Sequence, residues 1–506
     1  MPWLILAILG AGSGLWLAWR QPDATPVERG AWFVLPPLLV ALLFVYAETA
    51  LLNTRWTWSA CRLAPVIGLF HGYPLYSPAD STAINGWLYG PVGALAWLPA
   101  ALARSPEPAL LVAAVINLAF LLIPLAALAR HVAPESRVLA GLLFAATAAA
   151  LLQFYPTWYM ASALNVDAIA AGLGLASCLL LISKNPSRAR LATAAALTAL
   201  AAWTKQVDAP LVAAQAGWLW WVRGRRPALE FLVAWAVVLA GVAAAVFALQ
   251  DPASVILNLW TVPAHHPLVG GWAAARGEFT ELVRYAFPLW APALVLLAAG
   301  LRRQSSAAPA GALLCAAAVV LLPTGIMAAI KLGGDRNSLH SVYYLAAAAM
   351  AAVGGDWTLR LPFGRDLRAG LLLVTAATLL GLAVRQVRGY PGLTMLPPRC
   401  LSAEAFAFAR EHPGRAYFPW DPLATLLAEG KMSHFEYGVF DRQQAGLALP
   451  PDRLARDLPA AIEFIAYPRA DYPLTIVRAL PEFSATTLTP DWRFYHRSPG
   501  TPPKSP

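Results

Sequence analysis

Long apolar stretches, separated by short polar segments, run through most of the sequence. Phe231–Leu249 and Ala310–Ile330 each approach the ~20 residues that a helix needs to cross a hydrocarbon core of ~30 Å. Because backbone amides in lipid must find partners within their own segment, these stretches predict membrane-spanning helices. The pattern indicates about eleven or twelve spans. The first stretch, Leu4–Trp19, lacks the basic flank and cleavage site of a signal peptide, so we expect it to be retained.

Short clusters of arginine and lysine alternate with the apolar stretches, at 184–190, 223–226, 302–303 and 360–368. Cytoplasmic loops carry an excess of these residues, so we place all four clusters in the cytoplasm. The loops around Tyr155, around Lys205, at 251–287 and at 331–344 then fall outside, as does the tail after Arg385. Residues 53–88 become the first external loop, provided that Tyr89–Ala103, with its two prolines, does not cross fully.

The composition changes near residue 388. Residues 1–387 predict an all-α polytopic membrane domain, and residues 388–506 predict a small soluble α/β domain on the external side, which in a bacterium is the periplasm. In this second part we expect a helix at Ser402–Arg410 and strands at Arg415–Phe418, Ile462–Tyr467 and Trp492–His496. The last residues, Ser498–Pro506, predict a disordered end.

Composition supports the membrane assignment and excludes a nucleic-acid partner. Hydrophobic residues make up 59% of the chain and charged residues 13%, which is too little charge to cover a soluble protein of 506 residues. The net charge of +10 comes from clusters between apolar stretches, as topology requires, and membrane lipid is the expected surrounding. With four cysteines there is no disulfide framework, although a bond between Cys61 and Cys400 is an open alternative.

Polar and aromatic residues gather in the predicted external segments. The loop from Glu48 to Pro91 contains Arg55, Arg62, Asp80, Tyr76 and Tyr89. Later external segments add the following residues: Asp167, Lys205, Asp208, His265, Lys331, Arg336 and Asn337. Charged groups at membrane depth usually serve an ion pair or a substrate site.

Simpler interpretations exist for several of these residues. Lys205 and Asp208 are close enough in sequence to pair with one another, and Lys331 could reach the surface from a plain turn. The two adjacent histidines, His265 and His266, do not form a metal site without further ligands. External aromatic residues often only anchor helices at the membrane surface.

Taken together, these residues predict an external cavity that binds a phosphate on a long lipid tail. We expect Arg55, Arg62, Lys205, Lys331 and Arg336 to hold the phosphate. We expect six further residues to line the cavity: Tyr76, Tyr89, Asp167, Asp208, Asn337 and His265.

The order of these segments resembles the GT-C superfamily of membrane glycosyltransferases, which includes protein O-mannosyltransferases and the transferase that adds aminoarabinose to lipid A. The resemblance rests on Gly72-Tyr-Pro-Leu-Tyr76 and Tyr89-Gly-Pro91, then Asp167, then Thr204-Lys-Gln206, then Lys331-Leu-Gly-Gly with Asn337. The segment beginning Phe418-Pro-Trp-Asp also looks like that of bacterial members.

The resemblance implies a sugar donor on a polyprenyl phosphate and transfer at the external face of a bacterial inner membrane. The acceptor is a hydroxyl of a glycan, lipid or protein. A carboxylate would act as general base and cations would stabilise the leaving phosphate, with no nucleotide pocket. No resident cofactor is expected, and participation of a divalent cation is left open.

One feature departs from that family. Its members place an acidic residue early in the first external loop, whereas this sequence reads Leu-Leu-Asn-Thr-Arg55 there. Glu48 and Asp80 are the nearest carboxylates and the candidate bases. The alternatives are a transporter or flippase of a lipid-linked substrate, a polymerase or ligase of surface polysaccharide, and a non-catalytic protein of the same fold.

Overall fold

A computed structural model gives the fold of the chain. It describes residues 25–183, 186–302, 308–334, 336–360 and 364–389, most of 393–497, and four isolated residues before position 25. The predicted first helix and the predicted disordered end therefore lie outside the described residues, apart from those four positions.

The regular secondary structure of the described residues up to Gly389 is helical. Those in the first half are α2 (Pro26–Leu51), α3 (Thr57–Gly68), α4 (Pro91–Trp97), α5 (Pro106–Val132), α6 (Arg137–Leu151), α7 (Tyr155–Ser162), α8 (Asp167–Leu181), α9 (Arg188–Ala202) and α10 (Leu211–Arg223). Those in the second half are α11 (Arg225–Leu249), α12 (Pro252–Ile256), α13 (Val262–His265), α14 (Gly271–Arg302), α15 (Ala308–Val320), α16 (Leu322–Ala329), α17 (His340–Arg360) and α18 (Arg365–Gly389). Short helical turns η4 (Gln206–Asp208), η5 (Leu257–Thr261) and η6 (Arg336–Leu339) contribute to the site described below.

Local sequence explains where several helices begin. Thr25 and Glu28 form a capping box at the start of α2: the Thr25 hydroxyl accepts from the Glu28 amide at 3.3 Å, and the Glu28 carboxylate accepts from the Thr25 amide at 3.2 Å. Proline occupies the first turn of α2, α4 and α5, where its missing amide hydrogen costs nothing.

Five described helices are long and apolar enough to cross a membrane, or up to seven if each of two bent helix pairs counts as one span. They include α11, which contains the predicted span Phe231–Leu249. The predicted span Ala310–Ile330 corresponds to another of the five, Pro309–Ala329. Within it, α15 ends at Val320 and α16 starts at Leu322, with Pro323 in the first turn of α16. The number of spans, eleven or twelve by sequence, stays a prediction.

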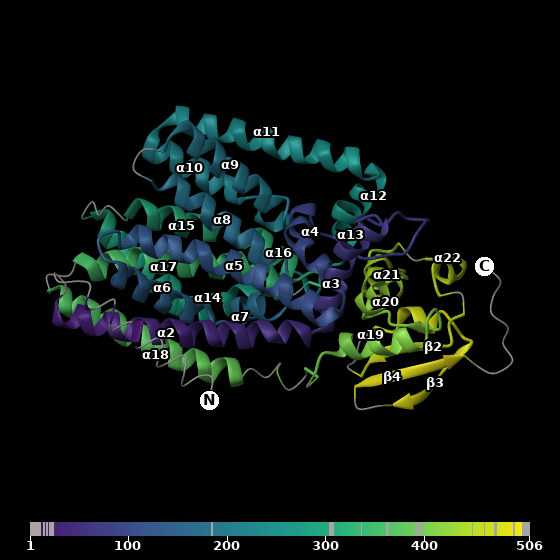
Figure 1. The fold of residues 1–506 in the computed structure, drawn as a ribbon. Helices are drawn as coiled ribbons and strands as arrows, with labels where there is room; N and C mark the ends of the chain where they lie inside the picture. The colour runs from purple at the N-terminus through teal and green to yellow at the C-terminus, as the bar shows by residue number, and fades with distance from the viewer. Residues whose placement is uncertain are drawn as a thin grey trace.

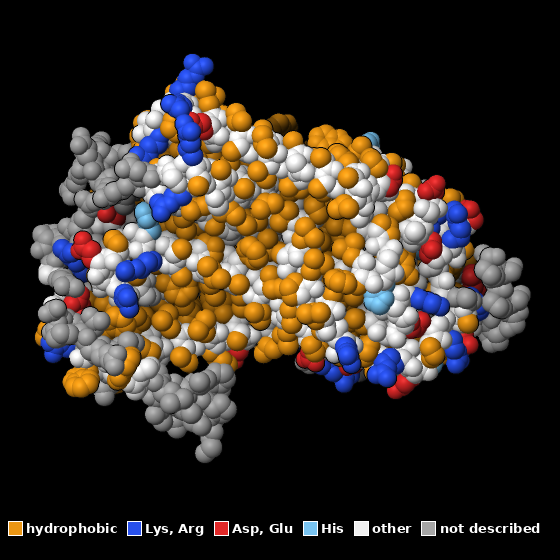
Figure 2. Space-filling view, turned by 45° about the horizontal axis from the view of Figure 1, so that its top comes forward, with side chains coloured by type: hydrophobic (Ala, Val, Ile, Leu, Met, Phe, Trp, Pro, Cys, Tyr) orange, Lys and Arg blue, Asp and Glu red, His pale blue; other side chains and the backbone are white. Residues whose placement is uncertain are grey.

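Hydrophobic side chains cover much of one face of the helical part (Figure 2). Figure 2 shows hydrophobic side chains across the middle of the molecule, whereas charged side chains gather at its two ends. On α11, Val233 and Val237 are 63% and 65% exposed, so this helix presents apolar surface that water would not tolerate. The chain is a multi-pass membrane protein.

The segment Tyr89–Ala103 does not cross the membrane. It forms α4 and the turn η3 (Leu98–Leu102), and the two together span 12 residues. At ~1.5 Å per residue such a helix reaches about 18 Å, well short of the ~30 Å core. This agrees with the sequence prediction.

The C-terminal part is a small α/β unit at one end of the helices (Figure 1). Its helices are α19 (Leu401–Glu411), α20 (Pro422–Glu429), α21 (Glu436–Gln444), α22 (Pro451–Ala455) and α23 (Thr475–Arg478). Its sheet has the order β1-β2-β4-β3, from β1 (Ala416–Tyr417), β2 (Phe464–Pro468), β3 (Phe483–Leu488) and β4 (Trp492–Arg497). The strands β1 and β2 are parallel, and β4 is antiparallel to β2 and β3. The predicted helix and three predicted strands are all present, and β3 was missed.

The first external loop packs directly against this unit. One core cluster contains Ile67 and Trp97 from the helical part together with Trp420 and Tyr437 from the C-terminal part. Backbones also meet closely: a Cβ added at Gly86 would lie 2.7 Å from the Cα of Gly438. The boundary between residues 387 and 388 stays a prediction.

The possible disulfide between Cys61 and Cys400 does not form. Both thiols are free and buried, and the Cys61 thiol donates to the Trp420 carbonyl at 2.9 Å.

Candidate functional site

A cavity of about 770 Å³ lies where the helical part meets the C-terminal unit. It is lined from α3 and the loop that follows it, from α7, η4, η5, α13 and η6, from the loop after α16, and from α21 of the C-terminal unit. These segments lie far apart in sequence but at the same end of the molecule. Of the predicted site residues, the cavity brings together Arg62, Tyr89, Lys205, Lys331 and Asn337.

Arg62 is buried in the wall of this cavity, at 9% exposure. Its guanidinium donates to the Leu164 carbonyl at 2.6 Å and to the side-chain oxygen of Asn165, and lies 5.7 Å from the centre of the Trp58 ring. In the part of the chain that the structure describes, no carboxylate lies within 4.0 Å of this guanidinium. Its charge is therefore available to a bound anion.

Lys205 is also buried, but it already has an anionic partner. Its ammonium pairs with Asp167, at the start of α8, and donates to the Asn337 carbonyl at 3.3 Å. The same Asp167 oxygen, Oδ1, lies 3.4 Å from Nδ1 of His340. The pair with Asp208, considered from sequence, is not the one observed, because Asp208 instead accepts from the Ser341 hydroxyl at 2.8 Å.

Lys331 is the third cation of the cavity. Its ammonium donates to the Pro263 carbonyl at 2.6 Å, and partial burial lowers the pKa of Lys331. The two glycines that follow it shape the turn. Gly333 has a φ of +76°, and a Cβ at Gly334 would lie 2.1 Å from the Ala328 carbonyl oxygen. The close approach that these glycines permit is therefore to the protein's own backbone.

Asp441, which the sequence analysis did not single out, supplies a carboxylate to the cavity. It projects from α21, and its side chain is 15% exposed. Burial raises the pKa of Asp441 to about 7. His266 lies beside it: its Nε2 donates to the Asp441 carbonyl at 3.0 Å and lies 4.0 Å from the carboxylate. Burial lowers the pKa of His266, so this ring is neutral at pH 7.

Aromatic side chains form the side of the cavity that faces the C-terminal unit. The ring of Trp58 meets Trp420 edge-on at 4.9 Å and Tyr437 at 5.6 Å. Trp420 comes from the segment Phe418-Pro-Trp-Asp, which the sequence analysis noted without a role. Such rings can stack against the C–H face of a sugar.

Both predicted catalytic carboxylates lie outside the cavity lining. Glu48, on α2, points toward α18, where its carboxylate lies 3.9 Å from Arg388. Asp80 is exposed on the loop after α3. Neither faces the three cations described above.

Other predicted residues support the surroundings of the cavity. Arg55 donates to the carbonyls of Leu396 and Pro397 in the link to the C-terminal unit. The Tyr76 hydroxyl donates to the Tyr89 carbonyl at 3.0 Å. The exposed His265 contacts the Thr261 carbonyl, so its neighbour His266 is the histidine of the cavity. The side chain of Arg336 lies outside the described residues.

No cluster of three or more His, Cys, Asp or Glu side chains within the described ranges could hold a metal ion.

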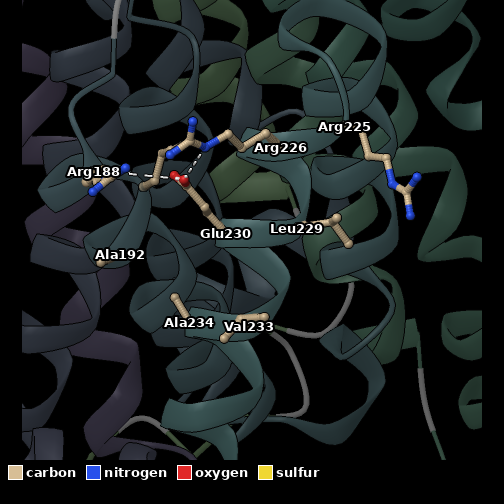
Figure 3. A pocket seen from close by; sticks show the side chains of 9 residues that line it. Arg188, Ala192, Arg225, Arg226, Leu229, Glu230, Val233 and Ala234 are labelled. Carbon is tan, nitrogen blue, oxygen red and sulfur yellow. Dashed lines mark hydrogen bonds and ion pairs between the residues drawn. The ribbon is translucent and has the colours of Figure 1, made fainter.

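A second hollow, of about 730 Å³, lies at the start of α9 and α11 and contains Arg188, Arg226 and Glu230 (Figure 3). The cavity lies beyond the other ends of these two helices, at Lys205 and Leu259. The hollow therefore belongs to the opposite end of the molecule, and it takes no part in the site.

The helices, the first external loop and the C-terminal unit together have a fold that solved structures share, as the sequence resemblance to the GT-C superfamily led us to expect. Two solved structures that share it are of ArnT from Cupriavidus metallidurans. One, bound to undecaprenyl phosphate, is 13% identical over 93% of this chain and 98% of that chain, with a TM-score of 0.57. The other, in the apo state, is 14% identical over 92% and 98%, also with a TM-score of 0.57.

Arabinofuranosyltransferase AftD from Mycobacteria is more distant. It is 16% identical over 90% of this chain and 40% of that chain, with a TM-score of 0.41. No family model and no curated protein matches the sequence.

Proposed function

We propose that this protein is a membrane glycosyltransferase that moves a sugar from a polyprenyl-phosphate donor to an acceptor hydroxyl. The observation that carries the proposal is the buried Arg62, whose hydrogen-bond partners are neutral and which shares a cavity with Lys205 and Lys331. A buried cation of this kind favours an anionic ligand, and the cavity lies in a protein whose helices present apolar surface to lipid. The shared fold with ArnT, which is seen bound to undecaprenyl phosphate, supports a lipid phosphate as that anion.

The three cations have different roles in this proposal. Arg62 and Lys331, whose hydrogen-bond partners are neutral, contact the donor phosphate. Lys205 is balanced by Asp167 and fixes the position of Asn337 at the cavity wall. The phosphate gains negative charge as it leaves, so nearby fixed cations lower the barrier to transfer.

Asp441 is the proposed general base, in place of Glu48 and Asp80. The acceptor oxygen forms a bond to the anomeric carbon, and the bond from that carbon to the phosphate oxygen breaks. The acceptor proton passes to the Asp441 carboxylate, and the lipid phosphate leaves with the bonding electron pair. A base with a pKa near 7 suits this proton transfer at neutral pH. His266 remains neutral and holds the Asp441 backbone.

The aromatic cluster of Trp58, Trp420 and Tyr437 is the proposed sugar-binding surface. It lies in the same cavity as Asp441, on the C-terminal side. By analogy with the ArnT fold, we place the protein in the inner membrane of a bacterium, with the cavity and the C-terminal unit on the periplasmic side. The arginine clusters between apolar stretches support this orientation.

Donor binding by the purified protein tests the proposal. In a titration with a polyprenyl phosphate, Arg62→Gln and Lys331→Gln should each weaken binding by about tenfold or more, because each removes a charge-assisted contact. Arg104→Gln, at an exposed arginine outside the cavity, is the matched control and should bind like the unmodified protein. Unchanged binding in both cavity variants would contradict the proposed donor site.

The transporter alternative makes a different prediction with the same material. A flippase would carry the lipid-linked sugar across a vesicle membrane with the bond between sugar and phosphate intact. A transferase breaks that bond only when an acceptor hydroxyl is present. Following both the intact donor and the released lipid phosphate separates the two functions.

A further inference from the structure

The second hollow described above is a groove of about 730 Å³ at the start of α9 and α11, and it combines cations with an apolar wall (Figure 3). Its charged residues are Arg188 on α9 and Arg225, Arg226 and Glu230 on α11. Its apolar residues are a separate set: Leu191, Ala192, Leu229, Val233 and Ala234. Nothing in the proposed transfer reaction uses this end of the molecule.

On both helices the arginines come first along the helix axis and the apolar residues follow. On α9, Arg188 lies one turn above Leu191 and Ala192, and on α11 the two arginines lie one and two turns above Leu229 and Val233. From Arg226 to Ala234 this stripe runs about 12 Å along the helix. A charged rim above an apolar slot matches a phospholipid, whose phosphate sits above its acyl chains.

Neighbouring residues place the arginines at the depth of lipid headgroups. Trp220 and Trp221, in the last turn of α10, are each 61% exposed. Exposed tryptophans collect at the boundary between hydrocarbon and headgroups. Further along α11 from the arginines, Leu229 and Val233 are 45% and 63% exposed, so this face of the helix is open to lipid chains.

The groove carries excess positive charge. Glu230 lies 3.1 Å from Arg226 and 3.9 Å from Arg188, between the two guanidinium groups. The guanidinium of Arg225 extends separately in Figure 3, and among the described residues no carboxylate pairs with it. Three arginines and one glutamate leave two positive charges. No side chain caps the start of α11, and the partial positive charge at this helix end also favours an anion.

We propose that this groove binds an anionic phospholipid of the leaflet opposite the C-terminal unit. Its phosphate contacts Arg225 and Arg226, and one acyl chain follows Leu229 and Val233. The lipid links the starts of α9 and α11, which the ion pair between Arg188 and Glu230 also connects across the groove. This site is separate from the transfer site and does not depend on the proposed function.

Native mass spectrometry of the detergent-purified protein tests the proposal with two lipids of equal chain length, phosphatidylglycerol and phosphatidylcholine. We expect phosphatidylglycerol to bind about tenfold more tightly. The variant R188Q/R225Q/R226Q should lose this preference. The control R29Q/R130Q/R137Q removes three exposed arginines from the same end, outside the groove, and should keep it.

A second variant distinguishes a loss of lipid binding from a loss of the folded structure. Val233→Trp keeps every charge and places a large ring in the slot, so it should weaken phosphatidylglycerol binding while the protein stays folded. Equal binding of both lipids, or equal losses in the groove and control variants, would overturn the proposal. So would full competition by inorganic phosphate, because that outcome identifies a simple anion site that does not recognise lipid.

Discussion

Arg62 combines two tasks that a lysine could not perform together. One terminal nitrogen of its guanidinium is already used by the Leu164 carbonyl and the Asn165 side chain, which leaves the remaining donors for a ligand. An ammonium is a point charge without this planar set of donors. We therefore expect Arg62→Lys to weaken donor binding by about tenfold although the charge is kept. A titration with polyprenyl phosphate measures this, and an affinity equal to that of the unmodified protein would refute the role of the guanidinium.

Asp441 gives the transfer reaction a predicted pH dependence. Burial raises the pKa of Asp441 from its ordinary value of 3.8 to about 7, so the carboxyl is mainly protonated below pH 7. A general base must be unprotonated. The transfer rate should therefore rise with pH through about 7 and level off above it, as steady-state rates across a pH series would show.

Variants at the same position separate a base from a structural carboxyl. Asp441→Asn should lower the transfer rate by about 100-fold or more, and Asp441→Glu should restore part of it. Asp452→Asn changes an exposed carboxylate of the same unit and should leave both the rate and its pH profile unchanged. An active Asp441→Asn protein with the original profile would rule out this base.

The sequence could reveal the cations of the site but not the carboxylate that we propose as its base. Arg62, Lys205 and Lys331 stand out because charge is rare in a chain this apolar, and the sidedness of loops places them at one end. Asp441 belongs to a polar helix of a soluble unit, where a carboxylate is ordinary. It reaches the cavity only because the C-terminal unit docks on the first external loop, and this tertiary contact has no local signal.

At the scale of elements, glycines set how closely the loops around the cavity can pack. Gly90 precedes α4, and a Cβ there would lie 1.7 Å from the Trp203 carbonyl oxygen, which the Val92 amide also contacts at 3.4 Å. Gly90→Ala should force these backbones apart and destabilise the protein by about 1–3 kcal/mol. The unfolding temperature in detergent measures this. Gly217→Ala, on α10 with open space around its Cβ position, is the control.

Element prediction succeeded where apolar periodicity is strong and failed where tertiary pairing decides. The helix α19 and the strands β1, β2 and β4 follow their predicted segments closely. The strand β3 has the sequence Phe-Ser-Ala-Thr-Thr-Leu, lies at the sheet edge, and is irregular between Ala485 and Thr487. Because this segment contains several polar residues, its sequence did not predict a strand. The apolar stretch Ala310–Ile330, by contrast, does form one candidate membrane span, Pro309–Ala329, with a one-residue turn between α15 and α16.

At the scale of the whole molecule, the site exists only if loops between different helices open on the same side of the membrane. The structure supports this arrangement, because η4, the loop after α16 and the C-terminal unit meet in one cavity. Arg188 and Arg226 lie at the opposite ends of α9 and α11, the helices that lead toward this cavity. Single cysteines in a background without the four native cysteines can test it in intact cells. A cysteine at exposed Gln206 should react with a membrane-impermeant maleimide.

The same reagent should reach a cysteine at Arg190 or Arg226 only after the membrane is opened. Both positions are exposed in the folded protein, so a lack of labelling in intact cells reports the membrane barrier and cannot be attributed to burial. Labelling of Gln206 and Arg226 from the same side would break the alternation that positive loops impose on successive helices. A lipid-linked sugar and the buried Arg62 could then not meet in the proposed way, since the donor phosphate has to approach from the side on which the C-terminal unit closes the cavity.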